Sequence, residues 1–216
     1  MLEWVQAVLA PAQTAILVVD VQHDFCALDG SFAQNGMEVS AARRTLAPLA
    51  ALLSAGRAAG ARPVYLRFVE DPHGHVVSEA YDRQRYRAGD QCRYCIDERG
   101  RAIVPEVAPR AAEPVIDKVR ASGFFNTALD TVLRCAGIRT IVLTGMATDS
   151  CVLATAIDAT ARDYYVVIAL DCLASFSAER HEAAMKLLTF KHPAATSAEI
   201  CALWLKRREE PCQPLT

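Results

Sequence analysis

Short apolar runs alternate along the chain with longer segments that have helical spacing. The apolar runs are rich in Val, Ile and Leu and are expected to form strands, at residues 14–20, 62–69, 113–118, 139–145, 164–171 and, more briefly, 194–196. Runs of this length are typical of strands buried on both faces of a parallel sheet. The segments with helical spacing are residues 38–60, 126–137, 149–162, 178–191 and 197–208. This alternation predicts an α/β fold, a three-layer α-β-α sandwich around a Rossmann-like, mostly parallel, six-stranded sheet.

The length and the irregular segments suggest how the chain is organised. With 216 residues, the chain has the size of a single domain, which we expect to span residues 1–216. Residues 70–112 are polar and have no clear period, so they are expected to form a long loop, with 70–100 lining a pocket. Residues 209–216 are expected to be a flexible tail.

The composition excludes several classes of function. Hydrophobic residues make up 52% and charged residues 22% of the chain, as in soluble globular proteins. A net charge of −2 leaves no basic face for a nucleic acid and no polybasic patch for a membrane. No apolar stretch approaches the ~18 residues of a membrane span, and Glu3 stands where a signal peptide would carry Lys or Arg. We therefore expect a cytoplasmic protein with no nucleic-acid or membrane partner.

The carboxyl ends of the predicted strands gather polar residues. Ligands of open parallel sheets bind at this edge, where the sequence places Asp20, Asp117–Lys118, Gly145–Cys151 and Asp171. Cys151 lies directly behind a strand and within the first turn of the following helix. Unpaired N–H groups and the helix dipole favour an anion there, so the thiol pKa is expected to fall below its free value of about 8.5. This position favours a nucleophile over a buried structural cysteine.

A cysteine nucleophile needs a base, and the strand ends offer an acid rather than a histidine. None of the five histidines follows a predicted strand directly, whereas Asp20 does, although an Asp there can also be only a turn residue. Lys118 is one of four lysines beside 19 arginines, and the other three fall in the last two helices. Its ammonium could be a compact charge with an adjustable pKa, or the side chain could simply extend to the surface. With the N–H groups of residues 147–151 receiving an oxyanion, these side chains suit acyl transfer from an amide or ureido carbonyl to sulfur, followed by hydrolysis.

Two segments of the chain carry a family resemblance. They are AILVVDVQHDF, from Ala15, and DKVRASGFFNTALDTVLRCAGIRTIVLTGMATDSCVLATAIDATARDYYVVIALD, from Asp117. Together they resemble the isochorismatase-like cysteine hydrolases, which include nicotinamidases, N-carbamoylsarcosine amidases, biuret hydrolases and ureidoacrylate amidohydrolases. The stretch KVRASGFFNTALDTVLRCAGI looks most like the ureidoacrylate and biuret branch. The resemblance implies a catalytic triad of Asp20, Lys118 and Cys151 that acts on a small amide, ureido or carbamoyl compound.

The resemblance also implies how the rest of the site is built. A cis peptide bond is implied between Met146 and Ala147, and the N–H groups of this turn, with that of Cys151, would form the oxyanion hole. It implies a homo-oligomer, a dimer or tetramer, and we expect no cofactor and no metal. Residues that could line the substrate pocket, or pack in the core instead, are Gln22, Phe25, Phe124, Phe125 and Tyr81 or Tyr86.

Two other interpretations stay open. Within the same superfamily the protein could be a nicotinamidase-like enzyme with a metal site at Asp71, His73 and His75, although their spacing favours a solvated loop, or an isochorismatase-like hydrolase of vinyl ethers. In a different class, Cys92 and Cys95 of the Arg-rich CRYC segment could bind a metal or take part in redox chemistry. A single C-x-x-C is weak evidence for zinc, which normally takes four ligands.

Overall fold

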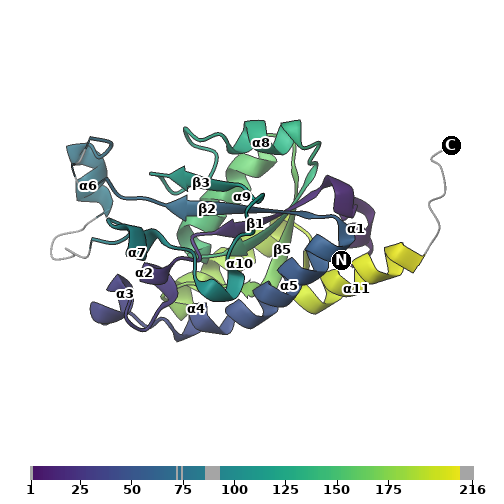
Figure 1. Cartoon of the computed structure of the whole chain (residues 1–216), viewed down its shortest axis with the longest axis horizontal. Helices are drawn as coiled ribbons and strands as arrows, with labels where there is room; N and C mark the ends of the chain where they lie inside the picture. The colour runs from purple at the N-terminus through teal and green to yellow at the C-terminus, as the bar shows by residue number, and fades with distance from the viewer. Residues whose placement is uncertain (1, 72, 74, 86–92, 210–216) are drawn as a thin grey trace.

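A computed structural model describes residues 2–71, 73, 75–85 and 93–209 (Figure 1). Within these residues six strands form one sheet in the order β3-β2-β1-β4-β5-β6, and every neighbouring pair is parallel. The strands are β1 (Thr14–Val19), β2 (Arg62–Phe68), β3 (Val115–Lys118), β4 (Thr140–Gly145), β5 (Tyr165–Leu173) and β6 (Ala194–Ala195). The predicted α/β fold around a parallel six-stranded sheet is confirmed.

The central strand β1 shows why the sheet is buried on both faces. Ile16 and Val18 belong to one hydrophobic cluster, whereas Ala15, Leu17 and Val19 belong to another. Successive side chains of a strand point to opposite faces, and all residues of β1 are buried. The strand therefore forms a continuous apolar run in the sequence instead of an alternating one.

Two layers of helices cover the sheet. The helices α5 (Leu46–Ala59) and α11 (Ser197–Glu209) contribute to the first cluster, and α8 (Leu129–Cys135), α9 (Leu153–Thr160) and α10 (Ala178–Lys191) contribute to the second. Figure 1 shows α8 on one side of the strands and α5 with α11 on the other. The shorter helices are α1 (Leu2–Val8), η1 (Pro11–Gln13), α2 (His23–Cys26), α3 (Ser31–Gln34), α4 (Ser40–Arg44), α6 (Glu79–Arg85), α7 (Glu98–Arg101), η2 (Pro105–Val107) and η3 (Thr148–Val152). None of the described helices combines the length and the apolarity that crossing a bilayer requires.

Two predicted segments differ from the structure. Residues 38–60, expected as one helix, form α4 and α5. Thr45 lies between the two helices, and its hydroxyl donates to the carbonyl of Ala42 at 2.7 Å, a local bond that competes with helix continuation. The long segment 70–112 is not a loop throughout, because it contains α6, α7 and η2.

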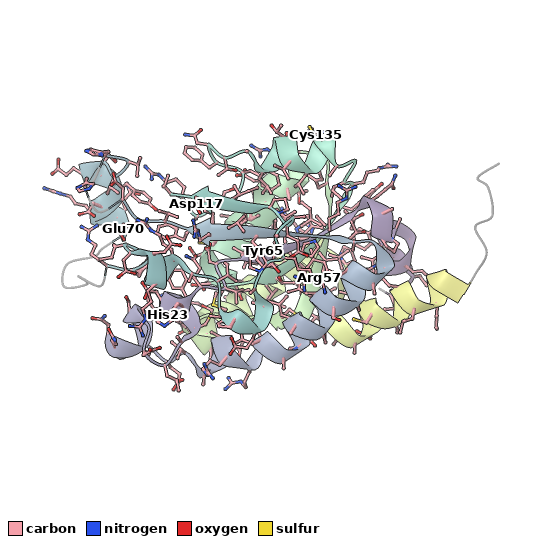
Figure 2. The ribbon with its side chains drawn as sticks, in the orientation of Figure 1. His23, Arg57, Tyr65, Glu70, Asp117 and Cys135 are labelled. Atoms are coloured by element: carbon pink, nitrogen blue, oxygen red, sulfur yellow. The ribbon has the colours of Figure 1, made fainter. Side chains whose placement is uncertain are left out.

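The order of the strands opens a crevice at the carboxyl ends of β1 and β4. From β1 the chain adds β2 and β3 on one side, and it then returns to add β4, β5 and β6 on the other. Ligands of doubly wound sheets bind where the strand order reverses in this way. The short helices α2, α3, α6 and α7 gather at this end of the molecule (Figure 1). Figure 2 shows His23 and Glu70, which follow β1 and β2, at the same end, whereas Cys135 lies away from them.

Candidate active site

Asp20 and Lys118 meet below the carboxyl ends of β1 and β3. Asp20 directly follows β1 with a φ of 52°, in the left-handed region that Asp tolerates better than most residues. Lys118 ends β3, which lies beyond β2 in the sheet, and its Nζ crosses the ring of Phe68 at 5.1 Å from the centroid. Nζ lies 2.7 Å from Asp20 Oδ2, and the two side chains are 0% and 3% exposed. The site therefore begins with a buried ion pair that joins two strands which are not neighbours.

The turn after β4 is shaped by a glycine. Gly145 has a φ of 103°, and a Cβ at this position would lie 2.0 Å from the carbonyl oxygen of Val19. Only glycine therefore fits between β4 and β1 here. The Met146 N–H then donates to the Val19 carbonyl at 2.9 Å, and the following peptide bond, Met146–Ala147, is cis, which confirms the predicted position. The Ala147 N–H donates to no other described backbone group.

Cys151 lies within a single π-helical turn, η3, that leads into α9. Its thiol interacts with the Asp20 carboxylate and with the Lys118 ammonium. The structure thus brings together the three side chains that the sequence places at the ends of β1, β3 and β4. The remaining strand-end candidate, Asp171, lies elsewhere: β5 continues past it to Leu173, and its carboxylate accepts hydrogen bonds from the backbone and hydroxyl of Ser197, both at 2.7 Å.

The electrostatics of the three groups differ from the sequence prediction in one respect. Burial raises the pKa of the Cys151 thiol to about 12, with the Asp20 carboxylate adding to the rise and the Lys118 ammonium opposing it. The predicted lowering of this pKa is wrong because the loss of water around the sulfur outweighs the favourable N–H groups of the turn. Burial also raises the pKa of Asp20, against the effect of Lys118. Burial by itself lowers the pKa of Lys118, but the charges of Asp20 and Cys151 raise it overall.

One oxygen of Asp20 remains available to the thiol. Oδ2 binds the Lys118 ammonium at 2.7 Å, whereas the buried Oδ1 has no hydrogen-bond partner among the described residues. A raised pKa makes the Asp20 carboxylate a stronger base, and the Cys151 thiol is the proton source beside it. With its pKa raised to about 12, the Cys151 thiol of the free site is protonated at neutral pH.

A cavity of about 510 Å³ opens onto these groups. Asp20, Ala147 and Cys151 are among the residues that line it. Its wall is aromatic and is built from Phe25, Phe32, Phe68, Tyr94 and Phe176. These rings pack edge to face, for example with centroid distances of 4.9 Å between Phe25 and Phe32 and 4.5 Å between Phe32 and Phe176, an arrangement that aromatic pairs prefer. The cavity therefore offers an apolar, aromatic wall next to a floor that carries the Asp20 carboxylate.

The first turn of α10 and the segment before it contact η3, the element that carries Cys151. The Thr148 N–H donates to the carbonyl of Ala174 at 2.9 Å, and the Thr148 hydroxyl lies 3.0 Å from Nδ1 of His181. Arg180 Nε lies 3.2 Å from Oδ2 of Asp149, and both of these side chains line the cavity. Asp149, Arg180 and His181 were not predicted from the sequence as site residues.

The residues predicted to bind substrate differ in whether they line the cavity. Phe25 lines the cavity, as does Tyr81, whereas Tyr86 lies outside the described residues. Gln22 does not line the cavity. Its amide is fully buried and bonds to the backbone of Phe68 in both directions, accepting at 2.7 Å and donating at 2.9 Å. The polar atoms of Gln22 thus join β2 to the segment after β1, which supports a structural role instead of the predicted binding role.

Phe124 and Phe125, which were also predicted to line the pocket, are not among the described residues that line the cavity. Phe124 belongs to the second hydrophobic cluster and stacks on Tyr164 with a centroid distance of 5.9 Å. Phe125 is 50% exposed. The backbone after β3 turns toward α9, where the Gly123 N–H donates to the Thr155 hydroxyl at 2.9 Å. This turn carries both rings away from the crevice.

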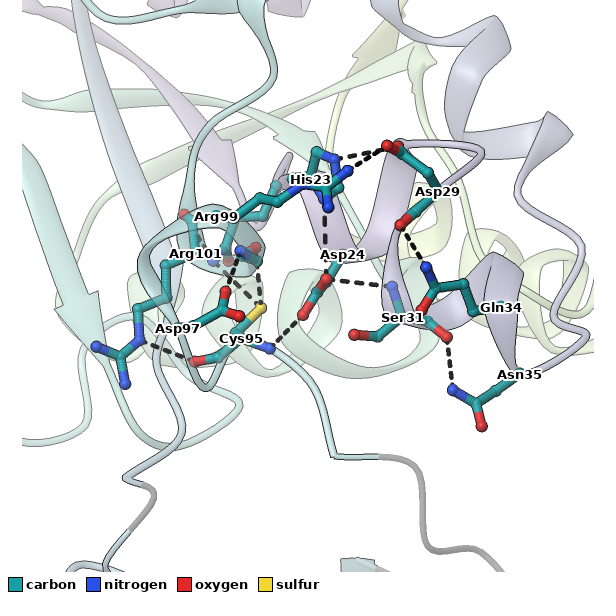
Figure 3. A network of polar contacts seen from close by, with 12 residues as sticks. His23, Asp24, Asp29, Ser31, Gln34, Asn35, Cys95, Asp97, Arg99 and Arg101 are labelled. Atoms are coloured by element: carbon teal, nitrogen blue, oxygen red, sulfur yellow. Dashed lines mark hydrogen bonds and ion pairs between the residues drawn. The ribbon is translucent and has the colours of Figure 1, made fainter.

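Cys95 has a structural environment. Its sulfur is buried and accepts a hydrogen bond from the Gln22 amide at 3.3 Å. Its N–H donates to the Asp24 carboxylate at 2.6 Å, and its carbonyl accepts from Arg101 Nε at 2.9 Å. Figure 3 shows this network, with Cys95 between Asp24 and Arg101. Cys92, the other half of the predicted metal or redox pair, lies outside the described residues.

The segment with Asp71, His73 and His75 is a tight turn. The two oxygens of Asp71 accept the backbone N–H groups of His73 and His75, at 2.9 and 2.5 Å. Within the described part of the chain, no group of three or more His, Cys, Asp or Glu side chains is arranged to hold a metal ion.

The fold is a parallel α/β sheet at whose carboxyl edge an acid, Asp20, and a thiol, Cys151, line one cavity, with the Lys118 ammonium paired to Asp20 beneath it. Residues 14–199 match the isochorismatase domain, and the chain belongs to this family. The ureidoacrylate amidohydrolase RutB of Agrobacterium fabrum is 35% identical over 175 residues, which cover 76% of each chain. The enzyme of the same name from Acinetobacter baylyi is 34% identical over 191 residues, covering 82% of this chain and 77% of its own.

A solved structure agrees with this assignment. The cysteine hydrolase from Pseudomonas syringae pv. phaseolicola 1448A superimposes with a TM-score of 0.79 and 28% identity, over 91% of this chain and 94% of its own. The family resemblance predicted from the sequence is confirmed. The amidohydrolase relatives also confirm the predicted class of enzyme, a hydrolase that acts on carbon–nitrogen bonds other than peptide bonds.

Proposed function

We propose that the protein hydrolyses a small amide, ureido or carbamoyl compound through a covalent thioester on Cys151. The observation that carries this proposal is the electrostatic interaction of the Cys151 thiol with a carboxylate and an ammonium at the base of a cavity of small-molecule size. The amidohydrolase relatives support it. In this proposal Asp20 is the general base and Lys118 is its electrostatic partner.

Proton transfer from Cys151 to Asp20 starts the reaction. With a thiol pKa of about 12, only about one thiol in 10⁵ would be ionised at pH 7 without a base. Asp20 accepts the proton as the sulfur attacks the substrate carbonyl, and the Lys118 ammonium stabilises the charge that develops. The N–H groups of Ala147 and Cys151 receive the oxyanion. The amine then leaves with the proton that Asp20 holds.

Water completes the cycle. Asp20, ionised again, takes a proton from a water molecule that attacks the acyl- or carbamoyl-thioester. The tetrahedral intermediate uses the same N–H groups, and the proton returns to the departing sulfur. The products are the acid or carbamate and the free Cys151 thiol, so the enzyme is regenerated without any redox change.

The proposal can be made more specific by asking which class of substrate the cavity accepts. The relatives are ureidoacrylate amidohydrolases, which makes an open-chain ureido compound the first candidate. The aromatic wall suits a planar molecule. A nicotinamidase-like activity has less support, because the Asp71 carboxylate already accepts two backbone N–H groups. Vinyl-ether hydrolysis has less support because it has no use for Cys151. A cytoplasmic location and a homo-oligomer remain predictions.

Ammonia release and a covalent adduct test the proposal together. The purified protein is incubated with a ureido acid, biuret, an N-carbamoyl amino acid and nicotinamide, and the ammonia released is measured. Brief acid quenching followed by intact-mass analysis is expected to show an acyl or carbamoyl adduct on Cys151. The variant Cys151→Ala is expected to lose both signals while it keeps the native circular dichroism spectrum.

An exposed thiol provides the matched control. Cys135 ends α8, is exposed and does not line the cavity, so Cys135→Ala is expected to retain both ammonia release and the adduct. Turnover that persists in Cys151→Ala, or an adduct found on another cysteine, would contradict the proposed mechanism.

A further inference from the structure

The charges that line the cavity are unevenly distributed. Among the described residues that line it, Asp20 and Asp149 are acids and Arg180 is the single cationic side chain. Lys118 already pairs with Asp20 at 2.7 Å beneath the cavity. Within the described part of the cavity wall, Arg180 is therefore the positive group that an incoming ligand meets. Its side chain is 60% exposed, whereas that of Asp149 is 19% exposed, so the arginine lies toward the mouth and the acid lies deeper.

The Nε side of the Arg180 guanidinium faces Asp149, and the opposite edge, with Nη1 and Nη2, is available to a ligand in the cavity. Nε lies 3.2 Å from Asp149 Oδ2, and the second oxygen of Asp149 accepts the Ser175 hydroxyl. Neither Nη1 nor Nη2 of Arg180 donates a hydrogen bond to any described residue, and Nε is the guanidinium nitrogen closest to Asp149. Two parallel N–H groups at this outer edge match the two oxygens of a carboxylate.

Two other arginines show what a fully paired guanidinium looks like in this chain. Arg57 binds both oxygens of Glu113, with Nε and Nη2 each at 2.7 Å, and Nη2 also lies 3.0 Å from the Tyr65 hydroxyl. Figure 2 shows Arg57 near Tyr65 and away from Glu70. Arg67 binds both oxygens of Asp117. Arg180 differs from both because its acid occupies only Nε.

We propose that Arg180 binds a carboxylate of the substrate and so restricts the enzyme to ureido or carbamoyl acids. This inference rests on the proposed function of the same cavity. The scissile carbonyl lies at Cys151, the body of the substrate lies along the aromatic wall, and its carboxylate lies at the outer edge of Arg180. Asp149 orients the guanidinium by holding Nε. The substrate class is thus a short, flat acid whose carboxylate is remote from the scissile bond.

A pair of substrates that differ in one charge tests this assignment. The pair is a ureido acid and its methyl ester, and kcat/KM is measured for wild type and for Arg180→Gln. The variant is expected to lose about 10- to 150-fold in kcat/KM for the acid, the range for a hydrogen bond to a charged group, mainly through KM. For the ester the change is expected to stay within about threefold. Arg180→Lys is expected to recover part of the loss, since it restores the charge without the fork.

The matched control is an arginine with the same kind of anchor outside the cavity. Arg134 Nε lies 2.9 Å from Asp130 on α8, and Arg134 does not line the cavity. Arg134→Gln is expected to leave both kcat/KM values unchanged. An equal loss for acid and ester in Arg180→Gln would show a purely structural role and would overturn the proposal, as would a wild type that prefers the ester.

Binding without turnover separates this inference from the proposed function. Calorimetry with Cys151→Ala and the intact ureido acid is expected to show binding that the added change Arg180→Gln weakens by the same factor. If wild type hydrolyses neither substrate but this binding difference is present, the proposed reaction fails while the carboxylate site stands. If the acid and its ester bind Cys151→Ala equally, the carboxylate site is refuted whatever the enzyme hydrolyses.

Discussion

Two cysteines at the carboxyl end of the sheet, Cys151 and Cys95, have opposite surroundings. The sulfur of Cys95 contacts the side-chain amide of Gln22 and the carbonyl of Gly100, both neutral groups. The sulfur of Cys151 faces a carboxylate and an ammonium and lines a cavity. Cys95 is buried and Cys151 is partly exposed to the cavity, so both accessibility and charge distinguish the two thiols. What separates a reactive thiol from a structural one here is the presence of a proton acceptor with an open path to a ligand.

Replacing each cysteine by alanine is expected to give the largest effect of all the tests of this difference. Cys151→Ala is expected to reduce turnover by at least about 10⁴-fold, because no other group can form the thioester. Its thermal midpoint should stay close to that of wild type. Cys95→Ala is expected to show the reverse, a loss of about 1–3 kcal/mol in the free energy of unfolding with near-normal turnover per folded molecule. Steady-state kinetics and urea unfolding measure both. Comparable turnover losses in the two variants would remove the distinction.

Breaking the ion pair next to Cys151 should affect stability as well as activity. Lys118→Met leaves Asp20 buried without its partner and is expected to destabilise the fold by about 3–5 kcal/mol. Adding Asp20→Asn is expected to recover a large part of that loss, because the unpaired charge is gone. The double variant should remain inactive. Urea unfolding of the single and double variants measures the coupling.

An exposed ion pair on the neighbouring residues serves as the control. Arg67 and Asp117 pair across β2 and β3, with Nε 2.6 Å from the carboxylate and side chains 23% and 49% exposed. Arg67→Met is expected to cost only about 0–1 kcal/mol. A cost for Lys118→Met no larger than this would show that Asp20 is not held as a buried anion.

The region around Cys95 depends on Gln22 for its polar contacts. Gln22→Leu removes the partner of the Phe68 backbone, where the amide now bonds at 2.7 and 2.9 Å. We expect a loss of about 1–3 kcal/mol in the free energy of unfolding, since these backbone groups stay buried. KM for the ureido acid should be unchanged, because Gln22 does not line the cavity. A large rise in KM with unchanged stability would restore the original prediction that Gln22 binds substrate.

The pH dependence of kcat/KM sharpens the role of Asp20. Burial raises the pKa of Asp20 above 3.8, and a protonated carboxyl cannot accept the thiol proton. The rate is therefore expected to fall about tenfold per pH unit below that raised pKa. On the alkaline side no loss is expected up to about pH 9, because the pKa of Lys118 is raised above 10.5 and the thiol reacts from its protonated form. A rate that keeps rising between about pH 8 and 9 would indicate a freely ionised thiol instead.

The sheet and the three central residues could be predicted because they follow from the strand pattern. Asp20 and Lys118 lie at the ends of apolar runs, and Cys151 follows the next strand through a glycine turn, so topology alone collects them at one edge. The direction of the thiol pKa was missed because the exclusion of water around Cys151 depends on loops that have no sequence period.

The aromatic wall and its charged mouth were harder to predict. Phe32, Tyr94 and Phe176 come from three separate loops or short helices, and no local pattern brings them together. Phe68 ends β2 and could have been found by the strand-end rule that selected Asp20. One feature of the sequence could have indicated the position of Arg180. Ser177 caps α10, and its hydroxyl accepts the Arg180 N–H at 3.4 Å, so Arg180 lies in the first turn of that helix.

The ammonium of the site comes from the rim of the sheet. β3 has four residues and one strand neighbour, and edge strands of this kind are the first to fray. Detachment of β3 would withdraw Lys118 from Asp20 while the central strands stayed paired. On heating, the enzyme would thus lose activity before its secondary structure melts, and an inactive but still folded state would precede global denaturation.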